Sequence, residues 1–192
     1  MSSEPKPLSV DGWLSSPRRQ TDSTCVPLAS LSLATVMKRR YTPARSTFLG
    51  RPISKAPRTE QALVSGFVAA LSNSQTSFGD VRAAREFYYQ RGRADVVAIS
   101  ADGEVLAFEA KLTRWRQALH QAFRNTCFAH RSYVVLPAGV ASSALQYERE
   151  FQRRNVGLCA VNDERVLVLR EAQSRLPLQP WLSGLAASHA AS

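Results

Sequence analysis

The sequence predicts an α/β domain with a mixed central sheet flanked by helices. Three observations lead to this fold class. An apolar stripe with helical spacing lies in residues 60–71, three short apolar segments separated by turn residues follow it, and beyond residue 114 helical segments alternate with short buried strands. The predicted order of elements is α-β-β-β-α-β-α-β-β, which is typical of helices packed on a sheet.

The first 58 residues precede that domain and lack a periodic pattern. Residues 1–23 are rich in Ser, Pro and charged side chains, so we expect them to be flexible. Residues 24–58 allow a short helix over 28–40, followed by a basic linker interrupted by prolines. We therefore interpret residues 1–58 as a flexible basic arm and residues 59–171 as the folded domain.

The first helix of the domain begins after Thr59, which is a residue type favoured as an N-cap. Glu60 lies in its opening turn. The apolar residues of this helix follow the spacing i, i+4, i+5, i+8, and they are Leu63, Phe67, Val68 and Leu71. A polar loop over residues 72–79 ends the helix.

Three strands follow this loop, over residues 87–89, 94–99 and 105–112. Residues 100–103, with the sequence Ser-Ala-Asp-Gly, form the turn between the second and third of them. The three strands together form a meander.

The turn decides which residues of the two strands lie opposite each other. A two-residue Asp-Gly turn would set Asp95 opposite Ala110, whereas a three-residue loop with Gly103 in the left-handed conformation sets Asp95 opposite Glu109. We predict the second register, because a metal site needs the two carboxylates to face each other.

The second half of the domain alternates helices and strands. A helix over residues 114–130 has a core stripe made of Trp115, Ala118, Leu119, Ala122, Phe123 and Thr126. The elements after it are a strand over 132–136, a helix over 141–154, and strands over 157–161 and 165–169. The strand at 132–136 is expected to be parallel to the one before it, because a crossover helix separates them. We expect residues 172–192 to be a loosely packed tail.

The charge of the chain points to a polyanionic partner. Its formal net charge is +10, and no acidic residue occurs between Asp22 and Glu60 or between Glu109 and Glu148. Nucleic acid is the default partner of a protein this basic. The alternative is an arginine-rich chain whose charged faces are only solvated.

Other functional classes receive no support from the sequence. The three cysteines lie far apart, which predicts neither a zinc site nor a disulfide framework. We see no signal peptide and no apolar run long enough to span a bilayer, so we expect a cytoplasmic protein without a membrane partner.

The strongest chemical signal is a pair of short segments, Arg-Gly-Arg-Ala-Asp-Val-Val at 91–97 and Phe-Glu-Ala-Lys-Leu at 108–112. Side chains alternate along a strand, so Glu109 and Lys111 are expected to share one face. With Asp95 nearby, this face could bind Mg²⁺, or Mn²⁺ in its place, because hard divalent ions prefer carboxylate oxygens. Only four of the 25 basic residues are lysines, which makes Lys111 more conspicuous.

These segments and the order of elements resemble the PD-(D/E)xK nuclease superfamily, over roughly residues 60–161. The resemblance implies a restriction endonuclease-like αβββαβ core. Asp95 matches the first acid of the motif, and Glu109-Ala110-Lys111 match its (D/E)xK portion. Ala94 stands where the superfamily name has Pro.

The resemblance also implies roles for individual residues. Asp95, Glu109 and the Ala110 carbonyl would bind the metal, which would polarise the scissile phosphate and acidify a water. Lys111 would orient this water and stabilise charge in the transition state. Glu60 is similar to an extra acid on the first helix of many members, although Glu86 competes for this role.

Further residues are candidates for binding the substrate. Gln121, with Gln117 as second choice, resembles a glutamine that several subfamilies carry on the helix after the motif. Arg114, Gln117, Gln121 and Arg124 share one face of that helix. Arg91 and Arg93 lie just before the first acid, where they suit phosphate contacts.

We therefore predict a metal-dependent nuclease that hydrolyses DNA phosphodiester bonds, with a second copy or a larger protein complex as candidate partners. The alternative is a non-catalytic nucleic-acid-binding or assembly subunit on the same fold. In that case the basic segment at 38–58, which contains Arg39 and Arg40, would be the working surface.

Overall fold

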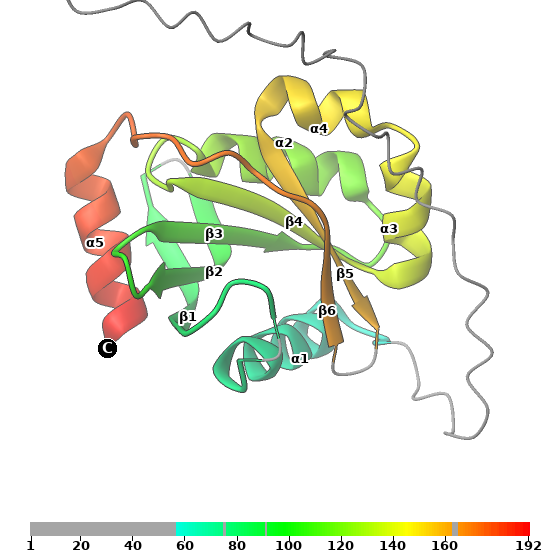
Figure 1. Cartoon of the computed structure of the whole chain (residues 1–192), viewed down its shortest axis with the longest axis horizontal. Coiled ribbons are helices and arrows are strands. Elements are labelled where there is room, and N and C mark those ends of the chain that lie inside the picture. The colour runs from blue at the N-terminus through cyan, green and yellow to red at the C-terminus, as the bar shows by residue number, and fades with distance from the viewer. Residues whose placement is uncertain (1–56, 75, 91, 163–164) are drawn as a thin grey trace, which may run out of the picture. The chain divides into compact units, whose positions relative to one another are not determined.

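The computed structural model describes residues 57–74, 76–90, 92–162 and 165–192. In these ranges the chain forms a six-stranded sheet and five helices (Figure 1). Nearly all of the predicted N-terminal arm, with Arg39 and Arg40, lies outside the described residues, and so does Arg91. Among the helices that are described, none combines the length and the apolar character needed to cross a membrane.

The elements follow the predicted order, with one helix more in the middle and one more at the end. The strands are β1 (Val81–Tyr89), β2 (Gly92–Ser100), β3 (Val105–Ala110), β4 (Arg131–Pro137), β5 (Val156–Asn162) and β6 (Arg165–Arg170). The helices are α1 (Glu60–Ser72), α2 (Trp115–Asn125), α3 (Ala138–Leu145), α4 (Glu148–Arg154) and α5 (Pro180–Ala191).

The strands lie side by side in sequence order, from β1 at one edge to β6 at the other. β1, β2 and β3 form the predicted antiparallel meander. β3, β4 and β5 are parallel to one another, and β6 returns antiparallel to β5. The parallel pair β3 and β4 is joined by α2, because a parallel neighbour requires a crossover connection.

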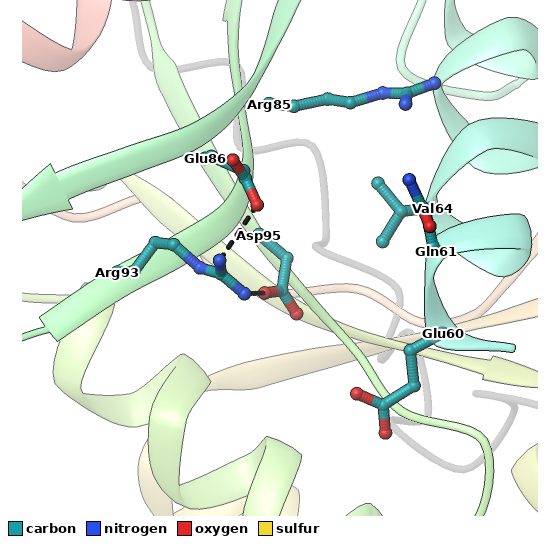
Figure 2. Close-up of a pocket in the computed structure, with 7 residues that line it drawn as sticks. All are labelled: Glu60, Gln61, Val64, Arg85, Glu86, Arg93 and Asp95. Atoms are coloured by element: carbon teal, nitrogen blue, oxygen red, sulfur yellow. Dashed lines mark hydrogen bonds and ion pairs between the residues drawn. The ribbon is translucent and has the colours of Figure 1, made fainter.

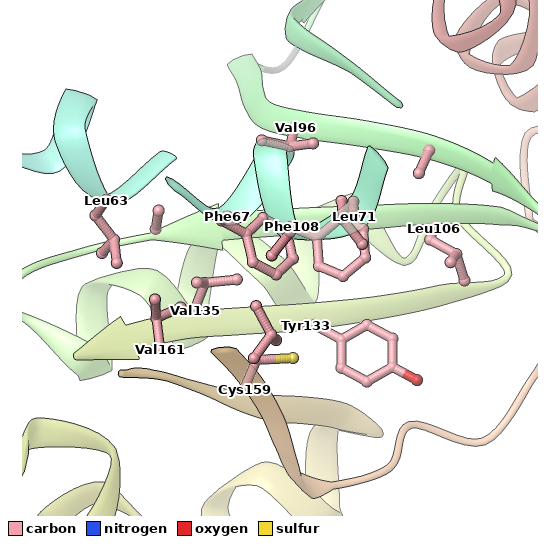
Figure 3. Close-up of a cluster of buried hydrophobic side chains, with 14 of the residues drawn as sticks. Leu63, Phe67, Leu71, Val96, Leu106, Phe108, Tyr133, Val135, Cys159 and Val161 are labelled. Carbon is pink, nitrogen blue, oxygen red and sulfur yellow. The ribbon is translucent and has the colours of Figure 1, made fainter. Parts of the chain in front are cut away.

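α1 covers one face of the sheet. The Thr59 hydroxyl accepts a hydrogen bond from the Ala62 N–H at 3.1 Å, which confirms the predicted N-cap. The predicted apolar stripe is buried apart from Val68, which is partly buried, and the ring of Phe67 meets that of Phe108 at a centroid distance of 4.8 Å (Figure 3). This packing fixes the first turn of α1, and hence Glu60, relative to β2 and β3.

Two groups of helices cover the opposite face. α2, α3 and α4 pack on β4 and β5, and α5 packs on the β1–β2 hairpin. The buried residues of α2 include Ala118, Leu119 and Ala122, as predicted. Phe123, which we expected in the core, is exposed, and Asn125 is buried in the same helix. The buried stripe of α2 therefore continues from Ala118 and Ala122 to Asn125.

The structure corrects two further expectations. Residues 172–192 are not a loosely packed tail, because α5 buries Leu182, Ala186 and Ala190 against the hairpin. The single helix expected over 141–154 is two helices, separated at Tyr147, whose backbone leaves the helical region. The break allows Tyr147 and Phe151 to pack together on Trp115.

Candidate active site

The β2–β3 turn brings Asp95 and Glu109 opposite each other. Gly103 has a φ of 82°, and the Ser100 N–H donates to the Glu104 carbonyl, so the connection is a three-residue loop. The resulting register pairs Val96 with Phe108, and its continuation sets Asp95 across from Glu109. The predicted register is confirmed.

The backbone is irregular at this position on both sides of Asp95. The β1–β2 ladder omits the pair between Glu86 and Asp95, and Glu86 has a φ of 56°, which is uncommon for a residue with a side chain. On the other side, the paired residues of β2 and β3 begin at Val96, and the Ala110 N–H donates instead to Asp95 Oδ2 at 3.0 Å. The Asp95 carboxylate is therefore held by the main chain of the motif strand.

Glu109 is a buried acid, with 1% of its surface exposed. Its Oε1 accepts a hydrogen bond of 2.7 Å from Asn125 Nδ2, and its Oε2 is buried without a hydrogen-bond partner among the described residues. Burial and the neighbouring negative charge of Asp95 raise the pKa of the Glu109 carboxyl to about 8, against the opposing effect of Asn125 and Lys111. A cation placed between the two carboxyl groups would favour the ionised form of Glu109.

Lys111 lies just beyond the end of β3, and its ammonium turns toward α1. Nζ is 3.0 Å from Glu60 Oε2, 3.2 Å from the Ala110 carbonyl oxygen and 3.9 Å from Asp95 Oδ2. We expected Glu109 and Lys111 to share one strand face, but β3 ends at Ala110, and the two side chains contact different helices. They remain close enough for Lys111 to act on the Glu109 carboxyl electrostatically.

A pocket of about 480 Å³ opens beside Asp95, between α1 and the β1–β2 hairpin. Its lining is shown in Figure 2 and consists of Glu60, Gln61, Val64, Arg85, Glu86, Arg93 and Asp95. Arg93 bridges two acids, at 2.8 Å from Glu86 and 3.4 Å from Asp95. The Arg85 guanidinium makes no ion pair or hydrogen bond with any residue that the structure describes, although it lines the same pocket as three carboxylates.

The structure thus brings together most of the predicted catalytic residues, namely Asp95, Glu109, Lys111 and Glu60. Both acids that competed for the third position, Glu60 and Glu86, line the pocket, each with a different cation.

The residues of α2 that were predicted to bind the substrate lie in different surroundings from one another. The Arg124 guanidinium lies near Gly92, at the start of β2. Its Nη2 is 3.6 Å from the position that a Cβ atom would take on this glycine. Arg114 and Gln117 are exposed at the start of the helix. Gln121 Oε1 is buried without a hydrogen-bond partner among the residues that the structure describes, and no described hydrogen bond joins Gln121 to Asp95 or Glu109.

The polar contact from α2 comes from Asn125, one turn beyond Gln121, and we had no expectation for this residue from the sequence. The available signal was an amide in the apolar stripe, seven residues after Ala118 and three after Ala122. Arg85 was also missed, because the strand that carries it was expected to begin only at Phe87. The full length of β1 depends on its pairing with β2.

The donors present fit a single hard divalent ion. In the described part of the chain no three His, Cys, Asp or Glu side chains form a ready metal cluster. Mg²⁺ commonly binds through only one or two carboxylates and retains several waters. Asp95, the Ala110 carbonyl and Glu109 Oε2, which has no hydrogen-bond partner among the described residues, are donors of this kind. A cation beside them would oppose the effects of burial and of Asp95 that raise the pKa of Glu109.

Comparisons with known proteins found structures that resemble this one, at low sequence identity. No family model matches the chain, and no curated protein matches its sequence. A protein of unknown function from Silicibacter pomeroyi has a similar structure, with a TM-score of 0.52 and 18% identity over 70% of this chain and 85% of that one. A repair endonuclease from Pyrococcus abyssi aligns with a TM-score of 0.40 and 14% identity, over 57% of this chain and 50% of that one.

Proposed function

We propose that this protein is a metal-dependent nuclease with a restriction endonuclease-like core that hydrolyses phosphodiester bonds in DNA. The observation that carries the proposal is the meeting of Asp95, Glu109 and Lys111 at the end of the β2–β3 hairpin, beside an open pocket. A raised carboxyl pKa next to a specific charged neighbour in such a place is typical of functional sites.

Asp95, Glu109 and the Ala110 carbonyl would hold the divalent ion. Such an ion supplies Lewis acidity to a phosphate and makes a bound water more acidic. The Asp95 carboxylate is oriented for this role by the Ala110 N–H, and the Glu109 carboxylate by Asn125.

Lys111 would place its positive charge next to the reacting phosphate. Its side chain is only 12% exposed, and its ammonium lies between Glu60 and Asp95, so it is held near the metal ligands. A fixed ammonium that stabilises developing negative charge is worth more here than in open water, because the partly buried site is less well screened.

Arg85 would bind a neighbouring phosphate of the same strand. It lines the pocket, and no described residue neutralises it, so it is available for a phosphate oxygen. Arg93 is already paired with Glu86 and Asp95. It would therefore hold these two carboxylates in place as well as contact DNA.

A cleavage assay with the full chain tests the proposal. The substrates are supercoiled plasmid, linear duplex, single-stranded and four-way-junction DNA, each with Mg²⁺ or Mn²⁺ and with EDTA. We expect Lys111→Ala to cut more slowly by a factor of about 100 or more, while its DNA affinity changes little. Arg116→Ala is the matched control, since it also removes one cation of an ion pair, with Glu150, away from the pocket.

The opposite result supports the alternative class. If no DNA is cut under any condition while binding persists and weakens with salt, the chain is a nucleic-acid-binding or assembly subunit. In that case neutralising Arg39, Arg40, Arg45 and Arg51 should weaken binding, and Lys111→Ala should have little effect.

A further inference from the structure

Asn125 is a fully buried amide whose two polar atoms both have partners. It lies at the C-terminal end of α2, with 0% of its surface exposed. Nδ2 donates to Glu109 Oε1 at 2.7 Å, and Oδ1 accepts from the Tyr89 hydroxyl at 2.6 Å. A chain of hydrogen bonds therefore runs from the end of β1 through α2 to the acid on β3.

Tyr89, the first residue in this series of hydrogen bonds, is held firmly in place. It is the last residue of β1 and pairs with Gly92 across the hairpin. Its ring packs on Phe87 and Phe128, at centroid distances of 6.2 and 5.2 Å. Packing thus fixes the ring, and the fixed ring places its hydroxyl on Asn125.

The two hydrogen bonds together determine which way the amide points. Because Oδ1 accepts from Tyr89, Nδ2 faces Glu109 Oε1. In the reverse orientation the amide oxygen would face Oε1, and once the carboxylate is ionised to bind a cation both atoms would be acceptors. Oε1 of Glu109 is thereby engaged, and Oε2 remains buried and unpartnered among the described residues. The carboxylate has one oxygen anchored and one left free.

We propose that Tyr89 and Asn125 are positioning residues that orient the Glu109 carboxylate so that its second oxygen can bind the divalent ion. This inference rests on the proposed function and adds to it two residues outside the Asp95, Glu109 and Lys111 set. Outer hydrogen-bond partners of ligating carboxylates fix the ligand's orientation, and their removal commonly costs about 10- to 100-fold in metal affinity or activity.

Tyr89→Phe tests the proposal most cleanly, because it keeps the ring packing on Phe87 and Phe128 and removes only the hydroxyl. Tyr133→Phe is the matched control. It removes another hydroxyl in a hydrogen bond to a side chain, at 2.7 Å from Glu171, that touches neither Asn125 nor Glu109. Asn125→Leu removes both hydrogen bonds of the amide at similar volume and serves as the stronger variant.

Mn²⁺ binding to the full-length wild type and variants is measured by titration calorimetry, at a temperature well below each melting point. We expect the Mn²⁺ Kd to rise about tenfold in Tyr89→Phe and about 10- to 100-fold in Asn125→Leu, with no change in Tyr133→Phe. In cleavage assays kcat at a fixed, subsaturating Mn²⁺ concentration should fall, while KM for DNA stays the same.

The outcomes separate this inference from the proposed function. A folded Tyr89→Phe with the wild-type Mn²⁺ Kd overturns the positioning role and leaves the nuclease intact. Wild-type protein that binds no Mn²⁺ overturns the proposed function, and the inference with it. If Asn125→Leu fails to fold, Tyr89→Phe still decides the matter, since it leaves the core packing in place.

Discussion

Replacing Glu109 with glutamine should make the metal-free protein more stable at neutral pH while abolishing its activity. Burial and Asp95 raise the pKa of this carboxyl from 4.5 to about 8. Between those two pH values the folded protein holds a proton that the unfolded chain has already released. The free energy of unfolding must therefore fall as the pH rises through this window, and level off above it.

The size of the effect follows from the width of the window. Each pH unit within it costs about 1.4 kcal/mol of stability, so the wild type should lose about 2.5 kcal/mol between pH 5.5 and pH 7.5 on account of this group. The glutamine side chain of the variant cannot ionise, but its amide oxygen can still accept from Asn125, and its amide N–H₂ can donate toward Asp95. The stability of Glu109→Gln relative to wild type should therefore increase by about 2.5 kcal/mol over the same interval.

Urea unfolding followed by circular dichroism, in EDTA at both pH values, measures this difference. Taking the variant minus the wild type removes the contribution of groups that titrate equally in both proteins. Adding Mn²⁺ at pH 7.5 should stabilise the wild type and not the variant, since only the wild type retains both of the proposed carboxylate ligands. A difference that stays constant between pH 5.5 and 7.5 would show that Glu109 is ionised in the folded protein, and would refute our account of the site.

Two other predictions concern the fold that supports the site. Gly157→Ala should cost several kcal/mol and lower the melting temperature sharply, because its Cβ would overlap the Tyr133 ring. Gly66→Ala, in open space on α1, should instead gain about 0.5–1 kcal/mol in the same thermal scan. Leu182→Ala should cost about 2–5 kcal/mol in urea unfolding, because α5 buries this side chain to 4% exposure, whereas Leu185→Ala, at 55%, should change stability by no more than about 0.5 kcal/mol. Equal effects of the two leucine variants would contradict the packing of α5 that we describe.

Local patterns of the sequence predicted most of the helices and strands of the domain, together with the acids and the lysine of the site. Thr59 and the apolar stripe after it predicted α1, because capping and helical periodicity act within a few turns of one chain segment. The Ser-Ala-Asp-Gly turn allowed two registers of β2 and β3, and we chose the one that sets Asp95 across from Glu109 because a metal site requires it. The three-residue loop, with Gly103 at a φ of 82°, confirms that choice.

Contacts between segments far apart in the chain could be decided only by the tertiary structure. Asn125 acts on Glu109, and Lys111 turns to Glu60, because α2 and α1 pack on opposite faces of the sheet, at angles that no local pattern encodes. The same holds for α5, which is rich in small residues and lacks a clear apolar stripe, so its burial depends on the hairpin it packs against. Sequence periodicity identifies which residues are buried in an element, whereas the partner that each polar group meets depends on the free energy of packing the whole domain.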